Sequence, residues 1–251
     1  MKRHCVIAVV AASLGADAAM SEPSGSPCAV TPAVTVSVAA VRDGRTITLT
    51  DGRELRLAGI EVAGRGAEAL RRLVDGKALR LPPASATDRY GRVVGFAALP
   101  GADQTVQEAL LAQGEALVSA RIEEKACAEA LFAAEKAARA ARRGLWADPN
   151  FAPLSSENLP GLDAARGRFA LVEGKVLSVR ESGATIYMNF GRRWTRDFTV
   201  TILKRQQRTF AAAGLDVRQL EGRRVRVRGW VERRGGPIIE ASAPGQIELV
   251  D

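Results

Sequence analysis

The sequence has very little of what catalytic and metal sites most often use. Among its 251 residues there is one histidine, His4, and there are three cysteines. Beyond residue 4 the chain has no imidazole, which excludes a serine–histidine–aspartate triad, a histidine general base and a histidine-ligated zinc site there. Long apolar runs are also missing, because Cys5–Ala16 is too short to span a bilayer and no later segment is long enough. We therefore expect no stable membrane span.

The first 20 residues have the pattern of a secretory signal. A short basic stretch, Met1–His4, precedes the apolar run, and Ala16–Ala18 offers small residues at the cleavage positions. We expect a cleavable signal peptide at residues 1–20, a linker at residues 21–33, and a periplasmic or secreted protein. The alternative is a buried N-terminal element. Cleavage would remove both the histidine and the first cysteine.

Two cysteines, Cys28 and Cys127, remain after that cleavage. In an oxidising compartment, a pair of cysteines is typically joined in a structural disulfide. We therefore predict a Cys28–Cys127 disulfide that ties the mature N-terminus to a helix. Two free buried thiols are the alternative.

Charge is distributed unevenly along the chain. Residues 1–164 contain 19 Lys and Arg and 19 Asp and Glu, so their net charge is zero, whereas residues 165–251 contain 17 and 9, a net charge of +8. A segment rich in Pro, Ser and Asn, Trp146–Gly167, lies near this change and predicts a linker at residues 154–165. A basic C-terminal domain joined to a neutral one suggests a polyanionic partner, such as nucleic acid or an anionic envelope surface.

The hydrophobic pattern predicts a mainly β protein with helices, built as two OB-fold barrels at residues 34–153 and 166–251. In the first domain, Asp-Gly turns at Asp43 and Asp51 join three strands, and two further strands follow. Three helices are expected there, over Gly66–Gly76, Thr105–Val118 and Glu124–Trp146, the last of them capped by Gly144.

The second domain shows period-two alternation in five segments, with one helix, Lys204–Gly214, between the third and the fourth. This order is again typical of an OB-fold. The strand segments are 168–182, 184–191, 197–203, 223–233 and 236–242.

Four short words in the first domain carry a family resemblance: DGRTI, RLAGIE, DRYGR and GLW, in that order. Through them, residues 34–153 resemble the thermonuclease, or staphylococcal nuclease-like, domain. The resemblance implies hydrolysis of nucleic-acid phosphodiesters with Ca²⁺ on an OB barrel that carries three helices. Residues 166–251 resemble the OB-type nucleic-acid-binding modules appended to such proteins, chiefly through MNFG and DFTVTI.

The resemblance assigns roles to individual positions. Arg56 and Arg92 match the family arginines that bind the scissile phosphate, and Tyr90 lies beside the second. Arg45 stands where the family has its first metal-ligand Asp. Glu61 stands at the second acid position and would be the metal ligand of an active site.

The acids that Ca²⁺ and an attacking water need are incomplete in this pattern. Arg45 replaces one acid by a cation, and Gly64 falls on the family Glu that activates water. Asp43, Asp51 and Glu68 lie nearby as possible substitutes, although the Asp-Gly turns explain the first two. We therefore expect Ca²⁺-dependent cleavage to be lost.

Two interpretations of Arg45, Arg56 and Arg92 stay open. They form a phosphate pocket that binds without cutting, or Arg45 pairs with Glu61 as an inert ion pair in place of the metal. The two interpretations are compatible if that pair is exposed.

Basic and aromatic residues gather in two stretches of the C-terminal domain. Arg224, Arg226 and Arg228 alternate with valines, so they share one strand face. Seven of the chain's 12 aromatic residues lie in this domain, and aromatics beside cations are what OB-folds use to bind single strands. The second stretch contributes the candidate contacts Tyr187, Arg192, Arg193, Trp194 and Arg196. The alternative is a solvated arginine face over a core that includes Ile186, Met188, Phe190 and Phe198.

These features predict an exported protein that binds nucleic acid, as single-stranded DNA or RNA, or another polyanion, with no cofactor and with cleavage lost. One alternative is an active divergent nuclease that holds Ca²⁺ through Glu61. A second is a non-enzymatic envelope protein whose barrels bind protein or surface glycans.

Overall fold

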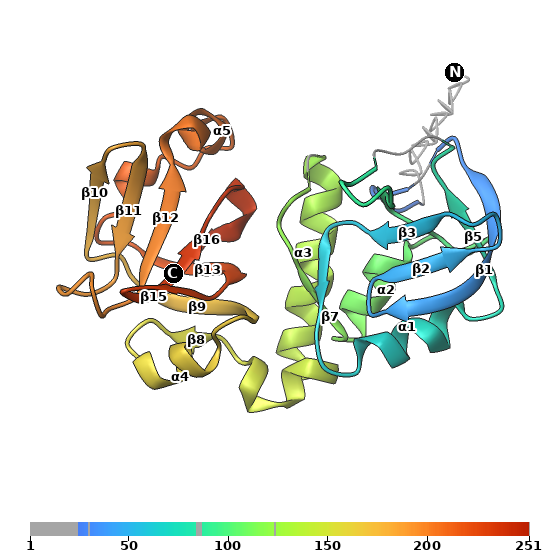
Figure 1. The fold of residues 1–251 in the computed structure, drawn as a ribbon, viewed down its shortest axis with the longest axis horizontal. Helices are drawn as coiled ribbons and strands as arrows, with labels where there is room; N and C mark the ends of the chain where they lie inside the picture. Colours follow the sequence, from blue (N-terminus) through green and yellow to red (C-terminus); the bar gives the residue numbers. More distant parts are fainter. Residues whose placement is uncertain (1–24, 30, 84–86, 123, 251) are drawn as a thin grey trace, which may run out of the picture.

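The computed structural model describes residues 25–29, 31–83, 87–122 and 124–250. The predicted signal peptide, residues 1–20, lies outside them. The chain is a mixed β protein with helices and consists of two parts. Helix α3 (Lys125–Ala140) belongs to the N-terminal part and lies on the side that faces the C-terminal part (Figure 1). Among the helices of the described residues, none has both the length and the apolar character needed to cross a membrane.

The N-terminal part is built around a curled five-stranded sheet. Neighbouring strands are antiparallel except for β3 and β6, which run parallel. In spatial order the strands are β5 (Ala78–Leu81), β1 (Val34–Asp43), β2 (Thr46–Leu49), β3 (Glu54–Leu57) and β6 (Val93–Gly95). This order is consistent with the predicted OB-type arrangement, whose closure into a barrel stays a prediction.

Both Asp-Gly turns lie where the sequence predicts them, on either side of β2. Gly52 in the second turn has a φ of +86°, a conformation that favours glycine. Gly44 in the first turn is needed for space instead, because a Cβ there would lie 2.3 Å from Cγ1 of Val62. This close approach packs the first turn against strand β4 (Ile60–Val62).

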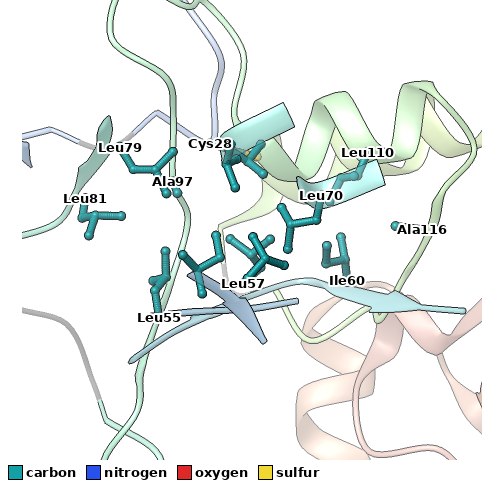
Figure 2. Packing of buried hydrophobic residues seen from close by; sticks show 14 of the residues in the cluster. Cys28, Leu55, Leu57, Ile60, Leu70, Leu79, Leu81, Ala97, Leu110 and Ala116 are labelled. Carbon is teal, nitrogen blue, oxygen red and sulfur yellow. The ribbon is translucent and has the colours of Figure 1, made fainter. Parts of the chain in front are cut away.

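The buried sides of the strands and helices share one apolar core. Figure 2 shows Leu55, Leu57 and Ile60 of the strands facing Leu70 and Leu110. The last two belong to helices α1 (Gly66–Val74) and α2 (Val106–Ala112).

The predicted Cys28–Cys127 disulfide is present in the structure. Both cysteines are buried, and the bond joins the segment before β1 to the first turn of α3. The disulfide therefore fixes the N-terminal segment to helix α3 at the core of this part.

Two helix predictions need correction around a pair of glycines. The predicted helix Thr105–Val118 stops at Ala112, and Ala116–Val118 is strand β7, which pairs with β4. Gly114 turns the chain there, with a φ of +74°. α3 ends at Ala140 rather than at Gly144. Gly144 instead packs on Gly114, where a Cβ would lie 2.6 Å from the Gly114 carbonyl oxygen.

The C-terminal part contains two sheets. The first has the order β10 (Ser178–Ser182), β11 (Thr185–Asn189), β12 (Thr199–Leu203), β15 (Gly236–Glu240), β14 (Glu232–Arg234). The second has the order β16 (Ile247–Leu249), β13 (Arg224–Trp230), β9 (Phe169–Lys175), β8 (Leu154–Ser155). Helix α5 (Gln207–Ala212) lies between β12 and β13, as predicted. β16 was not expected, and the closure of these sheets into an OB barrel stays a prediction.

The predicted linker, residues 154–165, is an ordered piece of the C-terminal part. β8 pairs in parallel with β9, opposing Leu154 to Val172. Helix α4 (Leu159–Ala164) follows and buries Leu162 in the C-terminal core. The composition of this segment signalled turns correctly, but Leu154, Leu159 and Leu162 supply enough apolar surface to hold it in place.

The remaining short 3₁₀ helices are η1 (Gly144–Ala147), η2 (Pro149–Phe151), η3 (Lys204–Gln206), η4 (Val217–Leu220) and η5 (Pro244–Gln246).

The two parts are joined by their own apolar cluster and by a buried ion pair. Leu171 of β9 packs with Leu117, Leu145 and Trp146 of the N-terminal part. Beside it, Arg228 of β13 reaches α3 of the other part, where it meets a carboxylate described below. These contacts fix the position of one part against the other.

Candidate functional site

Arg45 closes the first Asp-Gly turn and points toward β4. Its backbone N–H donates to Asp43 Oδ1 at 2.8 Å, and its Nη1 donates to the carbonyl oxygen of Ile60 at 3.1 Å. The same guanidinium forms an ion pair with Glu61, and the two side chains are 20% and 14% exposed. The Arg45–Glu61 pair offered as one interpretation of the sequence is therefore present, although it is largely shielded rather than exposed.

Arg56 lies in β3 between the buried Leu55 and Leu57. Its side chain therefore points to the face of the sheet opposite the core. Burial lowers the pKa of Arg56, and the like charges of Arg45 and Arg92 lower it further. Arg56 still remains charged at pH 7, because arginine titrates far above neutral pH. Among the described residues, no carboxylate forms an ion pair with Arg56. An anion placed beside these three cations would relieve their repulsion.

Arg92 is held by a carboxylate of its own loop. Its Nε and Nη2 donate to Asp88 Oδ2 at 2.8 and 2.6 Å, and this hydrogen bonding holds the pKa of Asp88 below its usual range. Tyr90, which the resemblance placed beside Arg92, is 66% exposed, and the guanidinium of Arg92 lies 5.1 Å from its ring centroid. Arg92 therefore offers an anion less unneutralised charge than Arg56 does.

The residues at this site do not fit a Ca²⁺ ion. Such an ion needs several carboxylate or carbonyl oxygens, but Glu61 is already paired with Arg45. Asp43 accepts the Arg45 backbone N–H, and Gly64 supplies no side-chain oxygen. Within the part of the chain that the structure describes, no group of three or more His, Cys, Asp and Glu side chains could hold a metal ion.

The two turn aspartates serve their turns, and Glu68 stays apart on α1. Asp51 accepts the Arg53 backbone N–H at 3.1 Å, as Asp43 does in the first turn. Burial acts to raise the pKa of Asp43, but hydrogen bonding, with the Arg45 backbone N–H as its largest contribution, and the positive charge of Arg56 together outweigh it, so that the pKa is lowered overall. Glu68 is exposed in the first turn of its helix. These contacts favour the structural interpretation of both aspartates.

We call the group formed by Arg45, Arg56 and Arg92 the arginine site. It opens onto a cleft between the two parts. Arg45, Arg56 and Glu61 line a cavity of about 430 Å³ whose opposite wall comes from the C-terminal part. That wall includes Phe169 and Trp230. We call this space the central cleft. Neither aromatic residue was singled out by the sequence, although Trp230 continues the alternating row of Arg224, Arg226 and Arg228.

The structure corrects the prediction that Arg224, Arg226 and Arg228 form one binding face. Val225 and Val227 are buried as expected, so the arginines do share a side of β13. Only Arg224 is exposed. The other two are neutralised: Arg226 by Glu173 and Glu248, and Arg228, which is 1% exposed, by Glu135 of α3. Arg228 therefore holds the two parts together and is not available to nucleic acid.

The turn between β11 and β12 leaves its basic and aromatic residues on the surface. Arg192, Arg193 and Arg196 are exposed, and Trp194 is 69% exposed. Asp197 organises this turn by accepting the Arg193 backbone N–H at 2.9 Å. Ile186, Met188, Phe190 and Phe198 are buried in the core, as the alternative interpretation of this domain required.

Tyr187 and Trp194 line a second cavity, of about 540 Å³, on the outer face of the C-terminal sheet. Its other lining residues include five with hydroxyl or amide side chains and the charged residues Arg180, Arg234 and Glu240. Alternation along β11 explains this face, because Tyr187 points away from the core that its buried neighbours enter. The structure thus brings two of the predicted aromatic contacts together in one groove, which we call the outer groove.

Comparison with known proteins identifies a family for part of the chain. Residues 58–148 match the model of the family described as Staphylococcal nuclease homologue. The matched range includes Glu61 and Arg92 and begins after Arg45 and Arg56. It supports the thermonuclease-like resemblance and indicates a nuclease-related or nucleic-acid-binding function. The match does not reach residues 166–251, whose OB-type resemblance stays a prediction. Among curated proteins, no match to the chain was found.

Proposed function

We propose that this chain binds nucleic acid or another polyanion at the arginine site and has lost efficient Ca²⁺-dependent cleavage. The observation that carries the proposal is the Arg45–Glu61 ion pair. It puts a guanidinium where the resemblance expects a metal-ligand carboxylate, and it occupies the one remaining acid.

The size of the electrostatic effect favours loss of the metal. Exchanging an acid for Arg45 changes the charge of the site by two units. A guanidinium a few Å from Ca²⁺ costs several kcal/mol even at an effective dielectric constant of about 20. To hold Ca²⁺, the carboxylate of Glu61 would have to offset this repulsion alone and also break its ion pair with Arg45. The same change makes the site better suited to phosphate, because Arg45 and Arg56 provide donors in a planar fork.

The alternative is an active divergent nuclease, and the family match over residues 58–148 favours it. In that case Glu61 would hold a divalent ion, with Arg56 and Arg92 on the phosphate. This function requires Arg45 to swing away from Glu61 when the metal binds.

The C-terminal part would add a second contact with the same polyanion. Its exposed Arg192, Arg193 and Arg196 lie near the aromatic residues of the outer groove, Tyr187 and Trp194. We also propose that the protein is exported, to the periplasm or beyond the cell. The Cys28–Cys127 disulfide supports this location, since disulfides persist in oxidising compartments.

Arg56→Ala is expected to weaken binding to a short DNA oligonucleotide about tenfold and to reduce the slope of log K against log salt by about 1. Arg92→Ala is expected to have a smaller effect, because Arg92 is already paired with Asp88. Both affinities are measured by fluorescence anisotropy over a series of salt concentrations.

Arg72→Ala is the matched control, because it removes the same charge from an exposed position of α1 outside the residues that line the central cleft. Its affinity should stay within about twofold of the wild type, as a surface charge distant from the ligand is screened by salt. Unchanged affinity in both Arg56→Ala and Arg92→Ala would refute the phosphate pocket.

A further inference from the structure

Trp230 presents an aromatic surface to the arginine site across the central cleft. It ends β13 and is 48% exposed, and Phe169 supports it in an edge-on contact with ring centroids 6.1 Å apart. A separate cavity of about 230 Å³ shares Glu61, Phe169 and Trp230 with the central cleft. A large apolar side chain is thus left partly uncovered beside a group of cations.

The charges in the central cleft leave it attractive to an anion. Of its three carboxylates, Glu61 is paired with Arg45, whereas Glu232 and Glu240 share a single cation, Arg234, at 3.2 and 3.8 Å. Two lining arginines, Arg56 and Arg121, form no ion pair with any described residue. The cleft therefore combines unneutralised guanidinium groups on one wall with an aromatic ring on the other.

The position of Trp230 is fixed by its neighbour two residues earlier on the same strand. Arg228 and Trp230 share one side of β13, and Arg228 is anchored to Glu135 of α3 by Nη1 contacts of 2.8 and 3.0 Å. Because α3 belongs to the part that carries the arginine site, this anchor holds Trp230 opposite that site. The aromatic contact is accordingly built into the fold before any ligand arrives.

We propose that the central cleft binds one nucleotide of an unpaired strand, with its phosphate at Arg45 and Arg56 and its base stacked on Trp230. The inference rests on the proposed function and adds to it a base contact supplied by the C-terminal part. Bases in a duplex are covered by their neighbours, whereas an unpaired base can turn out and stack on an aromatic side chain. The cavity volume of about 430 Å³ lies within the range of about 300–1,000 Å³ that is usual for ligand sites.

The test compares four probes of one length on the full mature chain: a single-stranded DNA, the same sequence as RNA, its DNA duplex, and an abasic strand that keeps the phosphates. The wild type should bind either single strand about tenfold more tightly than the abasic strand, because a base that stacks on an aromatic side chain adds to the binding free energy. Trp230→Ala should weaken binding to the single strands about tenfold and binding to the abasic strand less than twofold. Trp230→Phe should restore most of the loss.

Leu177→Ala is the control, since Leu177 is a 47% exposed apolar residue of the C-terminal part outside the cleft, and it should leave all four affinities unchanged. Equal binding of all four probes, with no effect of Trp230→Ala, would overturn the base contact and leave the proposed function standing. Binding of none of the probes would refute the proposed function itself. Trp230→Phe keeps an aromatic ring at the same position, so it guards the result against a folding defect in Trp230→Ala.

Discussion

Replacing Cys28 and Cys127 together by Ala is expected to lower the free energy of unfolding by about 4 kcal/mol. The disulfide closes a loop with a sequence separation of 99 residues, and a loop of that length restricts the unfolded chain strongly. Both cysteines are buried, so the double variant also loses apolar contacts in the core. Urea unfolding followed by circular dichroism measures the difference.

The wild type with a strong reductant should approach the stability of the double variant, and the reductant should leave the variant itself unchanged. A loss of less than about 1 kcal/mol in both cases would show that the cross-link contributes little to the folded state. It would also weaken the argument from the disulfide to an oxidising compartment.

Glu135→Gln is expected to cost about 3 kcal/mol of stability, because it leaves the charge of Arg228 buried with only Glu248, at 3.9 Å, as a counter-ion. The side chains of Glu135 and Arg228 are 1% and 2% exposed. Glu135 also accepts the Val118 backbone N–H at 2.9 Å, and the Arg228 guanidinium lies 4.6 Å from the ring centroid of Phe132. Thermal and urea unfolding should both report the loss, and the boundary between the two parts should become accessible to protease.

The matched double variant Glu135→Gln with Arg228→Met tests the physical reason for that loss. It removes both charges and keeps a side-chain oxygen for the Val118 N–H, so it should recover most of the stability. Glu129→Gln is the control, since its pair with Lys125 is exposed, 67% and 88%, and should contribute no more than about 0.5 kcal/mol. A cost of Glu135→Gln near that of the control would contradict the anchoring role given to Arg228.

The family resemblance picked out Arg45 and Arg56, and local structure accounts for where they lie. Arg56 alternates with buried leucines in β3, and Arg45 closes the first Asp-Gly turn. Alternation also separated Tyr187 from the buried Ile186 and Met188. These features depend on residues close in the sequence, so they can be derived without knowing the fold.

Features that depend on distant partners were missed or misjudged. Arg228 follows the same alternation as Arg224, but α3 covers it, and only a Glu on the buried stripe of that helix signalled a hidden cation. Gly114, which turns the chain after α2 with a φ of +74°, also packs against Arg143, 29 residues away, where a Cβ would meet the carbonyl oxygen at 2.2 Å. A binding role for Trp230 can be inferred only once the fold shows that the arginine site lies opposite it.

We propose that Arg45 replaces the metal at a nuclease-like site, so that the chain binds nucleic acid and does not cut it. To test this, labelled single-stranded DNA and RNA are incubated with the purified mature chain in Ca²⁺, in other divalent ions and in chelator, and are followed for both binding and cleavage. We expect a complex that forms equally with and without chelator and leaves the strand intact. Chelator-sensitive cleavage that Glu61→Ala abolishes would contradict it.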